Sequence, residues 1–155
     1  IGKVMSHRIT FKIKNAGITV DGSFSDLKAE ISFDPIAPDK SVLRASIGVA
    51  SIKTGKDMRD RDLQERKYFY VEKYPRIEMV SKKIKSLSKD RFTGTFDLTI
   101  RDVTKEVEVP FTYMRKDNQG TFKGTFTVDR RDFGVGGNSI ILSDDVKIFI
   151  EVTTK

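Results

Sequence analysis

The sequence predicts an all-β protein in which about eight antiparallel strands close into a barrel, with one short helix across or over one end. Apolar residues occupy every second position in many segments, for example from Leu27 to Phe33 and from Val146 to Val152. A period of two is typical of strands with one buried and one solvated face. So many strands in 155 residues form a sheet that closes on itself or packs on another. A closed sheet of about eight strands has an interior just wide enough for one slender ligand.

The first part of the chain is expected to form strand regions at residues 7–14, 18–33 and 41–52. The sequence Asn15-Ala16-Gly17 is a turn signal after the first of these regions. The second region is expected to bend around Gly22. Two prolines and two aspartates in residues 34–39 predict a loop before the third region, because proline interrupts strand pairing.

The charged stretch at about residues 55–67 predicts the one short helix. Thr54 and Asp57 resemble a capping box at its start. Asp57 and Arg61 are four residues apart with the acid first, which is the favourable order on a helix. Tyr74-Pro75 marks the return to extended chain, because proline disfavours helix in the residue before it.

The second part of the chain is expected to form five strands, at residues 76–84, 91–101, 106–114, 121–128 and 145–153. Residues 116–120 have the composition of a hairpin loop. Residues 133–145 contain three glycines and an asparagine and predict a long irregular loop.

Length and composition indicate a single domain that covers residues 1–155. The chain has no cysteine, which excludes disulfides and thiol chemistry, and no apolar run long enough for a membrane span. It begins with Ile1 rather than methionine, which either a removed export signal or a trimmed sequence explains.

The net charge of +7 has two readings. One is a solvated surface of mixed charge, and the other is attraction to an anion such as nucleic acid, an acidic membrane surface or a phosphorylated ligand. The aromatic residues fall mostly in the inward phase of the strands, for example Phe11 and Phe126, rather than in an exposed basic stripe. This argues against nucleic acid as a partner, whereas peripheral contact with a membrane stays open.

No catalytic constellation is recognisable. His7 is the single histidine, and no Gly-x-Ser-x-Gly motif accompanies it. The glycines of residues 134–138 lack the Lys-Ser/Thr that ends a P-loop. We therefore expect a protein without enzymatic activity, catalytic residues, metal or cofactor.

Alternation does not distinguish a filled core from an apolar tunnel. If a tunnel exists, its ligand is long and apolar, and a polar head group would lie at the mouth, near Arg59, Lys56 or residues 134–138. The predicted lining follows the inward phase and consists of Phe11, Ile13, Phe24, Leu27, Ile31, Ala45, Ile47, Phe96, Leu98, Val109 and Phe111. Arg59 completes the predicted ligand-binding set, although Arg59 and Asp60 can equally pin the helix to the barrel.

Four motifs in order along the chain resemble those of the YceI-like family of bacterial lipid-binding proteins. They are the Gly22–Asp34 region, Ser51-Ile52-Lys53-Thr54-Gly55 continuing to Tyr74-Pro75, Leu98–Lys105, and Arg131-Asp132-Phe133-Gly134. The resemblance covers nearly the whole chain, with departures at Asn15, where many members have histidine, and at Asp102, where glycine is usual.

This resemblance implies an extended, lipocalin-like barrel with one helix that binds a polyisoprenoid, such as a quinone tail or a prenyl phosphate, in its interior. It also implies a periplasmic or secreted location, which fits the missing initial methionine, as well as no secure catalytic activity and a plausible homodimer. The leading hypothesis is thus a non-enzymatic carrier or scavenger of an isoprenoid lipid. The alternative is an interaction module with a filled core that binds an anionic partner through its basic surface.

Overall fold

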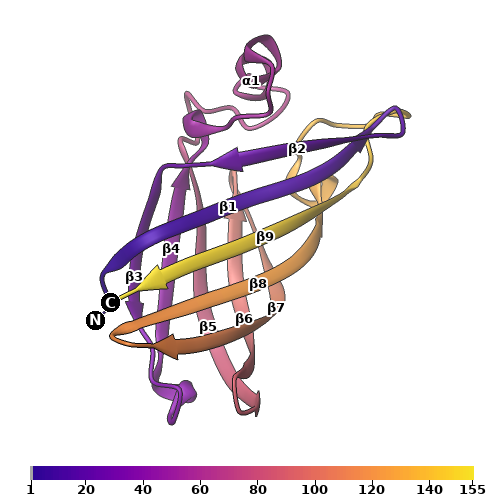
Figure 1. The fold of residues 1–155 in the computed structure, drawn as a ribbon. Coiled ribbons are helices and arrows are strands. Elements are labelled where there is room, and N and C mark those ends of the chain that lie inside the picture. The colour runs from indigo at the N-terminus through magenta and orange to yellow at the C-terminus, as the bar shows by residue number, and fades with distance from the viewer. Residues whose placement is uncertain (1) are drawn as a thin grey trace.

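The structure, a computed structural model that describes residues 2–155, is one antiparallel sheet of nine strands curled into a lipocalin-like barrel (Figure 1). Its strands are β1 (Val4–Asn15), β2 (Ile18–Phe24), β3 (Leu27–Ser32), β4 (Val42–Gly48), β5 (Arg76–Ser88), β6 (Arg91–Ile100), β7 (Val103–Lys116), β8 (Gln119–Asp129) and β9 (Asp145–Thr154). The helical elements are α1 (Asp57–Leu63) and three 3-10 turns, η1 (Pro38–Lys40), η2 (Val49–Ser51) and η3 (Arg130–Phe133). The predicted fold class is confirmed.

The sheet curls so far that its two outermost strands are consecutive in the chain. The spatial order is β2-β1-β9-β8-β7-β6-β5-β4-β3, and only Ser25 and Asp26 connect β2 to β3. Side chains from other strands hold this β2–β3 corner, formed by Ser25 and Asp26. Arg76 Nη1 lies 2.9 Å from Asp26 Oδ2, and His7 Nε2 donates to the Ser25 carbonyl at 2.8 Å. The N–H of Gly2 also donates to the carbonyl of Ile31 on β3, at 2.7 Å. The single histidine, His7, thus has a structural partner in the Ser25 carbonyl.

The expectation of one strand over residues 18–33, bent at Gly22, is wrong, and the chain has nine strands rather than about eight. The break falls at Ser25 and Asp26, where the corner contacts hold the backbone. Gly22 lies inside β2 opposite Phe11, and a Cβ atom there would approach Phe11 Cζ to 2.1 Å. This glycine accommodates an aromatic ring and does not mark a bend.

The one predicted helix is confirmed but is shorter than expected, at Asp57–Leu63. The expected capping box is wrong, because Lys56 is the N-cap residue and makes no side-chain cap. Thr54 instead binds the side chain of Asp60 on α1, because its N–H and hydroxyl donate to Asp60 Oδ1 at 2.8 and 2.6 Å. The carboxylate that holds this segment is thus one turn later than the pattern predicts.

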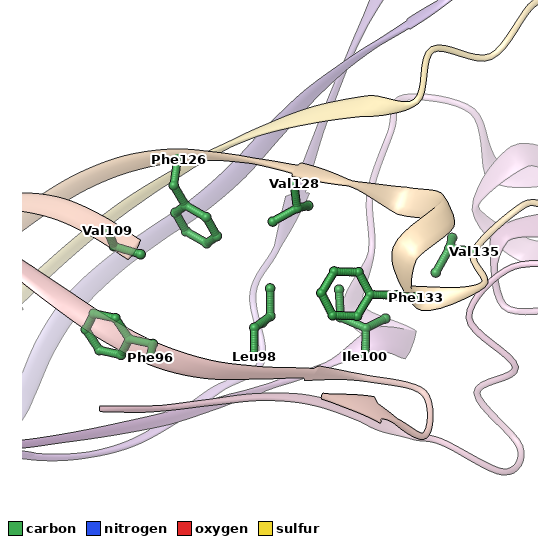
Figure 2. Close-up of a cluster of buried hydrophobic side chains, with 8 residues drawn as sticks. All are labelled: Phe96, Leu98, Ile100, Val109, Phe126, Val128, Phe133 and Val135. Atoms are coloured by element: carbon green, nitrogen blue, oxygen red, sulfur yellow. The ribbon is translucent and has the colours of Figure 1, made fainter. Parts of the chain in front are cut away.

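The barrel wall is not continuous between β7 and β8. Their pairing ends at Phe111 and Gly124, although β7 begins at Val103 and β8 continues to Asp129. A cluster of buried side chains from β6, β7, β8 and η3 lies behind the gap, and Figure 2 shows Phe126 and Val128 pointing toward the β6 side chains. These side chains close the barrel interior where hydrogen bonds between the two strands are missing.

The two predicted loops of the C-terminal half are confirmed. The β7–β8 hairpin turns at Asp117 and Asn118, and Asp117 takes a left-handed φ of 57°. Residues 134–144 form the irregular loop, although η3 precedes it, which the sequence did not predict. Within residues 2–155 no helix has the length and apolar character needed to cross a membrane.

Candidate functional site

An apolar cavity of about 250 Å³ lies inside the barrel. Nine of the twelve predicted ligand-binding residues line it, namely Phe11, Ile13, Phe24, Leu27, Ile31, Ala45, Ile47, Arg59 and Leu98. The other three, Phe96, Val109 and Phe111, line a smaller cavity of about 90 Å³. Ile31 and Ala45 line both cavities, so the two spaces adjoin. Whether these residues contact a ligand stays a prediction.

Small side chains lie next to each other on two adjacent strands of the cavity wall. Ala29 on β3 is the register partner of Ala45 on β4, and Ala45 in turn pairs with Met79 on β5. All three side chains line the main cavity. Two alanines side by side leave a volume that larger aliphatic residues would fill.

The polar groups of the cavity gather at the end near α1. Arg59 Nε donates to Thr54 Oγ1 at 2.7 Å, and Arg59 Nη2 donates to the Thr54 carbonyl. Asn15 and Tyr68 line the same cavity. Arg59 therefore lines the cavity and braces the chain before α1, and its contact with a ligand stays a prediction.

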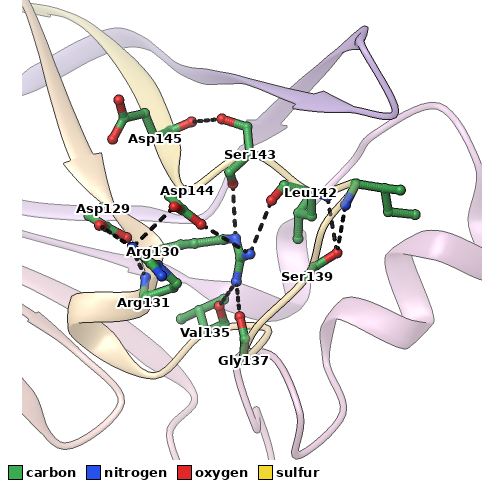
Figure 3. Close-up of polar contacts among 11 residues, drawn as sticks. Asp129, Arg130, Arg131, Val135, Gly137, Ser139, Leu142, Ser143, Asp144 and Asp145 are labelled. Atoms are coloured by element: carbon green, nitrogen blue, oxygen red, sulfur yellow. Dashed lines mark hydrogen bonds and ion pairs between the residues drawn. The ribbon is translucent and has the colours of Figure 1, made fainter.

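Arg130 is a cavity-lining residue that the sequence analysis missed. Its side chain is only 4% exposed, and its guanidinium donates to four backbone carbonyl groups (Figure 3). These acceptors are Ser143 at 2.9 Å, Val135 at 2.8 Å, Gly137 at 2.6 Å and Leu142 at 3.2 Å. Arg130 therefore holds the 134–144 loop against the end of the cavity.

An acidic and basic cluster on the outer side supports the same loop. Arg131 lies 3.1 Å from Asp144 and 3.5 Å from Asp129. The backbone N–H of Arg131 also donates to the Asp129 carboxylate at 2.9 Å, which lowers the pKa of Asp129. Asp129 is the N-cap of η3, so this bond fixes the turn that carries Phe133 into the hydrophobic cluster.

The cavity offers little acid–base chemistry. No histidine, cysteine, aspartate or lysine lines it, and its one carboxylate residue, Glu78, is exposed. Over residues 2–155, no group of three or more acidic, histidine or cysteine side chains could hold a metal ion. In the same part of the chain, every buried side-chain nitrogen and oxygen has a hydrogen-bond partner.

A lipocalin-like barrel around an apolar cavity is the class that fold and site define. The chain belongs to the YceI-like family, since the family model described as YceI-like domain matches residues 4–154. A protein named UPF0312 from Pseudomonas savastanoi pv. phaseolicola is 32% identical over 136 residues, which cover 83% of this chain and 71% of that protein.

Solved structures share the fold. Burkholderia cenocepacia BcnA superposes with a TM-score of 0.92 at 25% identity, covering 96% of each chain. The YceI protein of Campylobacter jejuni has a TM-score of 0.79 at 29% identity, over 88% of this chain and 85% of that one. A domain from Saccharophagus degradans, described as polyisoprenoid binding, has a TM-score of 0.79 at 12% identity, over 99% and 96%.

Proposed function

We propose that this protein binds a long apolar isoprenoid lipid inside the barrel, without catalysis, for carriage, storage or scavenging. The observation that carries the proposal is the apolar cavity inside the barrel, with Arg59 and Thr54 at the end near α1. The Saccharophagus degradans domain, described as polyisoprenoid binding, has the same fold and supports this ligand class.

The shape of the interior favours a chain over a compact ligand, because the two adjoining cavities share Ile31 and Ala45. Burial of each CH₂ group contributes about 0.8 kcal/mol, so a five-carbon isoprene unit contributes about 4 kcal/mol before entropic costs. Most of the affinity therefore comes from the tail.

The head group, a quinone ring or a phosphate, is proposed to lie at the polar end. Arg59 uses Nε and Nη2 to hold Thr54, while its Nη1 has no hydrogen bond to any of residues 2–155. That N–H group can donate to an oxygen of the head group without loosening the chain before α1.

The test is a substitution that fills the cavity. Ala45→Trp places an indole where both cavities meet, and Ala50→Trp on the exposed side of η2 is the matched control. Each protein is purified from a bacterial host, extracted with organic solvent and analysed by mass spectrometry. We expect a stoichiometric isoprenoid with the wild type and Ala50→Trp, and none with Ala45→Trp, with circular dichroism unchanged.

Retention of the lipid by Ala45→Trp would show that the cavity is not its site. An empty wild-type extract, together with no uptake of quinones or prenyl phosphates, would contradict the proposal itself. The alternative is an interaction module with a filled core that binds an anionic partner through its basic surface, and the cavity inside the barrel favours the lipid over it. Its own signature would be binding that weakens steeply with salt, whereas burial of an apolar tail is nearly independent of salt.

Other expectations stay predictions: a periplasmic or secreted location, a homodimer, and the absence of nucleic acid, metal and cofactor. Fractionation of the native host and analytical ultracentrifugation of the purified protein measure the first two directly.

A further inference from the structure

Three isoleucines are exposed at the tips of two segments at one end of the barrel. Ile18, in the β1–β2 hairpin, is 71% exposed, Ile141 is 57% exposed, and Ile140 is fully exposed. We propose that this end of the barrel, formed by the hairpin and the 134–144 loop, docks on the surface of an anionic lipid bilayer. The isoleucine side chains would insert below the head groups.

The two segments form one connected surface. The N–H of Ala16 donates to the carbonyl of Ile141 at 2.8 Å, and the N–H of Ser143 donates to the carbonyl of Lys14 at 2.9 Å. Figure 1 shows the hairpin tip and the loop together at the end of the barrel that also carries α1. Hydrogen bonds and the buried Arg130 thus fix the isoleucines in place before any membrane is met.

The same segments line the cavity. Leu142 follows the two exposed loop isoleucines directly and faces the cavity, and Ile13, Asn15 and Val20 of the hairpin do so as well. A bilayer touching the tips would therefore lie next to the polar end of the cavity. The inference rests on the proposed function for its purpose, because an isoprenoid lipid has to leave a membrane to reach the barrel.

Charge around the tips favours an anionic surface. Lys14 and Lys67 are exposed there and form no ion pair with residues 2–155, and the N–H of Gly136 in the loop donates to the Lys67 carbonyl at 2.9 Å. The neighbouring acid, Asp144, is held by Arg131 at 3.1 Å. Each free lysine near an anionic membrane adds attraction, in line with the net charge of +7.

The size and shape of the patch favour a bilayer over a protein partner. A stable protein interface buries roughly 1,200 Å² or more over a matched surface. Three side chains on protruding tips provide much less, whereas they suffice to insert into the head-group region of a membrane.

The experiment measures binding to vesicles to which no isoprenoid has been added, so that it is independent of the proposed function. Vesicles of phosphatidylcholine, with and without phosphatidylglycerol, serve as probes. The chain has no tryptophan, so Ile140→Trp introduces a single reporter of insertion. Ile36→Trp is an exposed control in the β3–β4 connection, which lies at the other end of the barrel (Figure 1). We expect a blue shift on adding anionic vesicles with Ile140→Trp only.

The triple variant Ile18→Ser/Ile140→Ser/Ile141→Ser should weaken vesicle binding at least about tenfold. The reason is that the apolar surface of the three isoleucines is then no longer removed from water on binding. Ile36→Ser should leave vesicle binding unchanged.

The double variant Lys14→Gln/Lys67→Gln should weaken binding only to the phosphatidylglycerol vesicles. Lys89→Gln, which is exposed in the β5–β6 turn, is the control for the loss of charge.

Several results would overturn the proposal: wild-type protein that binds neither vesicle, equal blue shifts from both tryptophans, or full binding by the triple serine variant. A dimer that the triple variant dissociates, without vesicle binding, would assign the patch to self-association instead. Isoprenoid uptake from detergent solution should be unchanged in the triple variant, since these side chains lie outside the cavity. Failure of that uptake in the wild type would contradict the proposed function alone.

Discussion

Replacing Arg130 with alanine is expected to lower the free energy of unfolding by about 3–5 kcal/mol, because one buried side chain serves four backbone carbonyl groups. A hydrogen bond to a charged group contributes about 1.5–3 kcal/mol, so complete loss of four would give about 6–12 kcal/mol. Gly137 is exposed and Leu142 and Ser143 are half-buried, so water can replace the arginine there, whereas Val135 is buried. The expected loss of about 3–5 kcal/mol therefore lies below that range.

The measurement is urea unfolding followed by far-ultraviolet circular dichroism, since the chain has no tryptophan. Arg130→Lys should give an intermediate loss, because one ammonium group cannot reach all the carbonyl groups of a planar guanidinium. Arg131→Ala is the matched control, and we expect only a small change because that side chain is 47% exposed.

Hydrogen exchange locates the effect. The amides of Ala16 and Ser143 bridge the loop and β1 and should exchange faster in Arg130→Ala, while amides in the β5–β6 pairing should not. A loss of stability below about 1 kcal/mol, or unchanged exchange at both bridging amides, would refute the view that Arg130 holds the loop.

Three other measurements test local contacts. Asp60→Ala removes the buried carboxylate that holds the segment before α1 and should lower unfolding free energy by about 2–3 kcal/mol in urea, with a smaller loss for Asp60→Asn. Gly22→Ala should push the Phe11 ring into the cavity, cost about 1–3 kcal/mol and reduce isoprenoid uptake; unchanged uptake would contradict this. Nuclear magnetic resonance should place the pKa of Asp129 below its ordinary 3.8, because the Arg131 N–H stabilises the carboxylate. Its contribution to stability is then complete above pH 3.8 and is lost as pH falls through the lower folded pKa, and a midpoint at or above 3.8 would contradict this.

The strands were predictable because the alternation of apolar residues is local in the sequence and the buried positions follow the same alternation. In β6, Arg91–Ile100, every second residue is buried. The break between β2 and β3 was not predictable, because the contacts that make it come from Arg76, which is distant in sequence. The predicted bend at Gly22 was wrong for a related reason, since the Phe11 ring that this glycine accommodates belongs to another strand.

Arg130 shows a signal that the sequence did contain. The inward phase of β8 runs through Phe122, Gly124, Phe126 and Val128, and one further step of two reaches Arg130. An arginine at the end of an apolar inward series is either unpaired, which is costly, or surrounded by acceptors. Its four carbonyl partners come from an irregular loop, whose path alternation cannot predict.

The cavity itself depends on which small residues meet, and this is set by strand register. Alternation placed Ala29 and Ala45 on the inner face, but only the register makes them direct partners. The sequence could therefore name nine residues of the lining and still leave a filled core and a tunnel as equal alternatives.

The size of the cavity is an argument about function. Unfilled core volume costs about 24 cal/mol per Å³ in mutational series, so a cavity of 250 Å³ corresponds to about 6 kcal/mol of forgone stability. That is comparable with the whole stability of many domains of this size. Larger aliphatic residues at Ala29 and Ala45 would recover part of it, because both side chains face the space directly. Under the proposed function, a bound apolar chain would recover the same contacts and the barrel could still release it, so the cavity that costs stability in the empty protein would be the binding site.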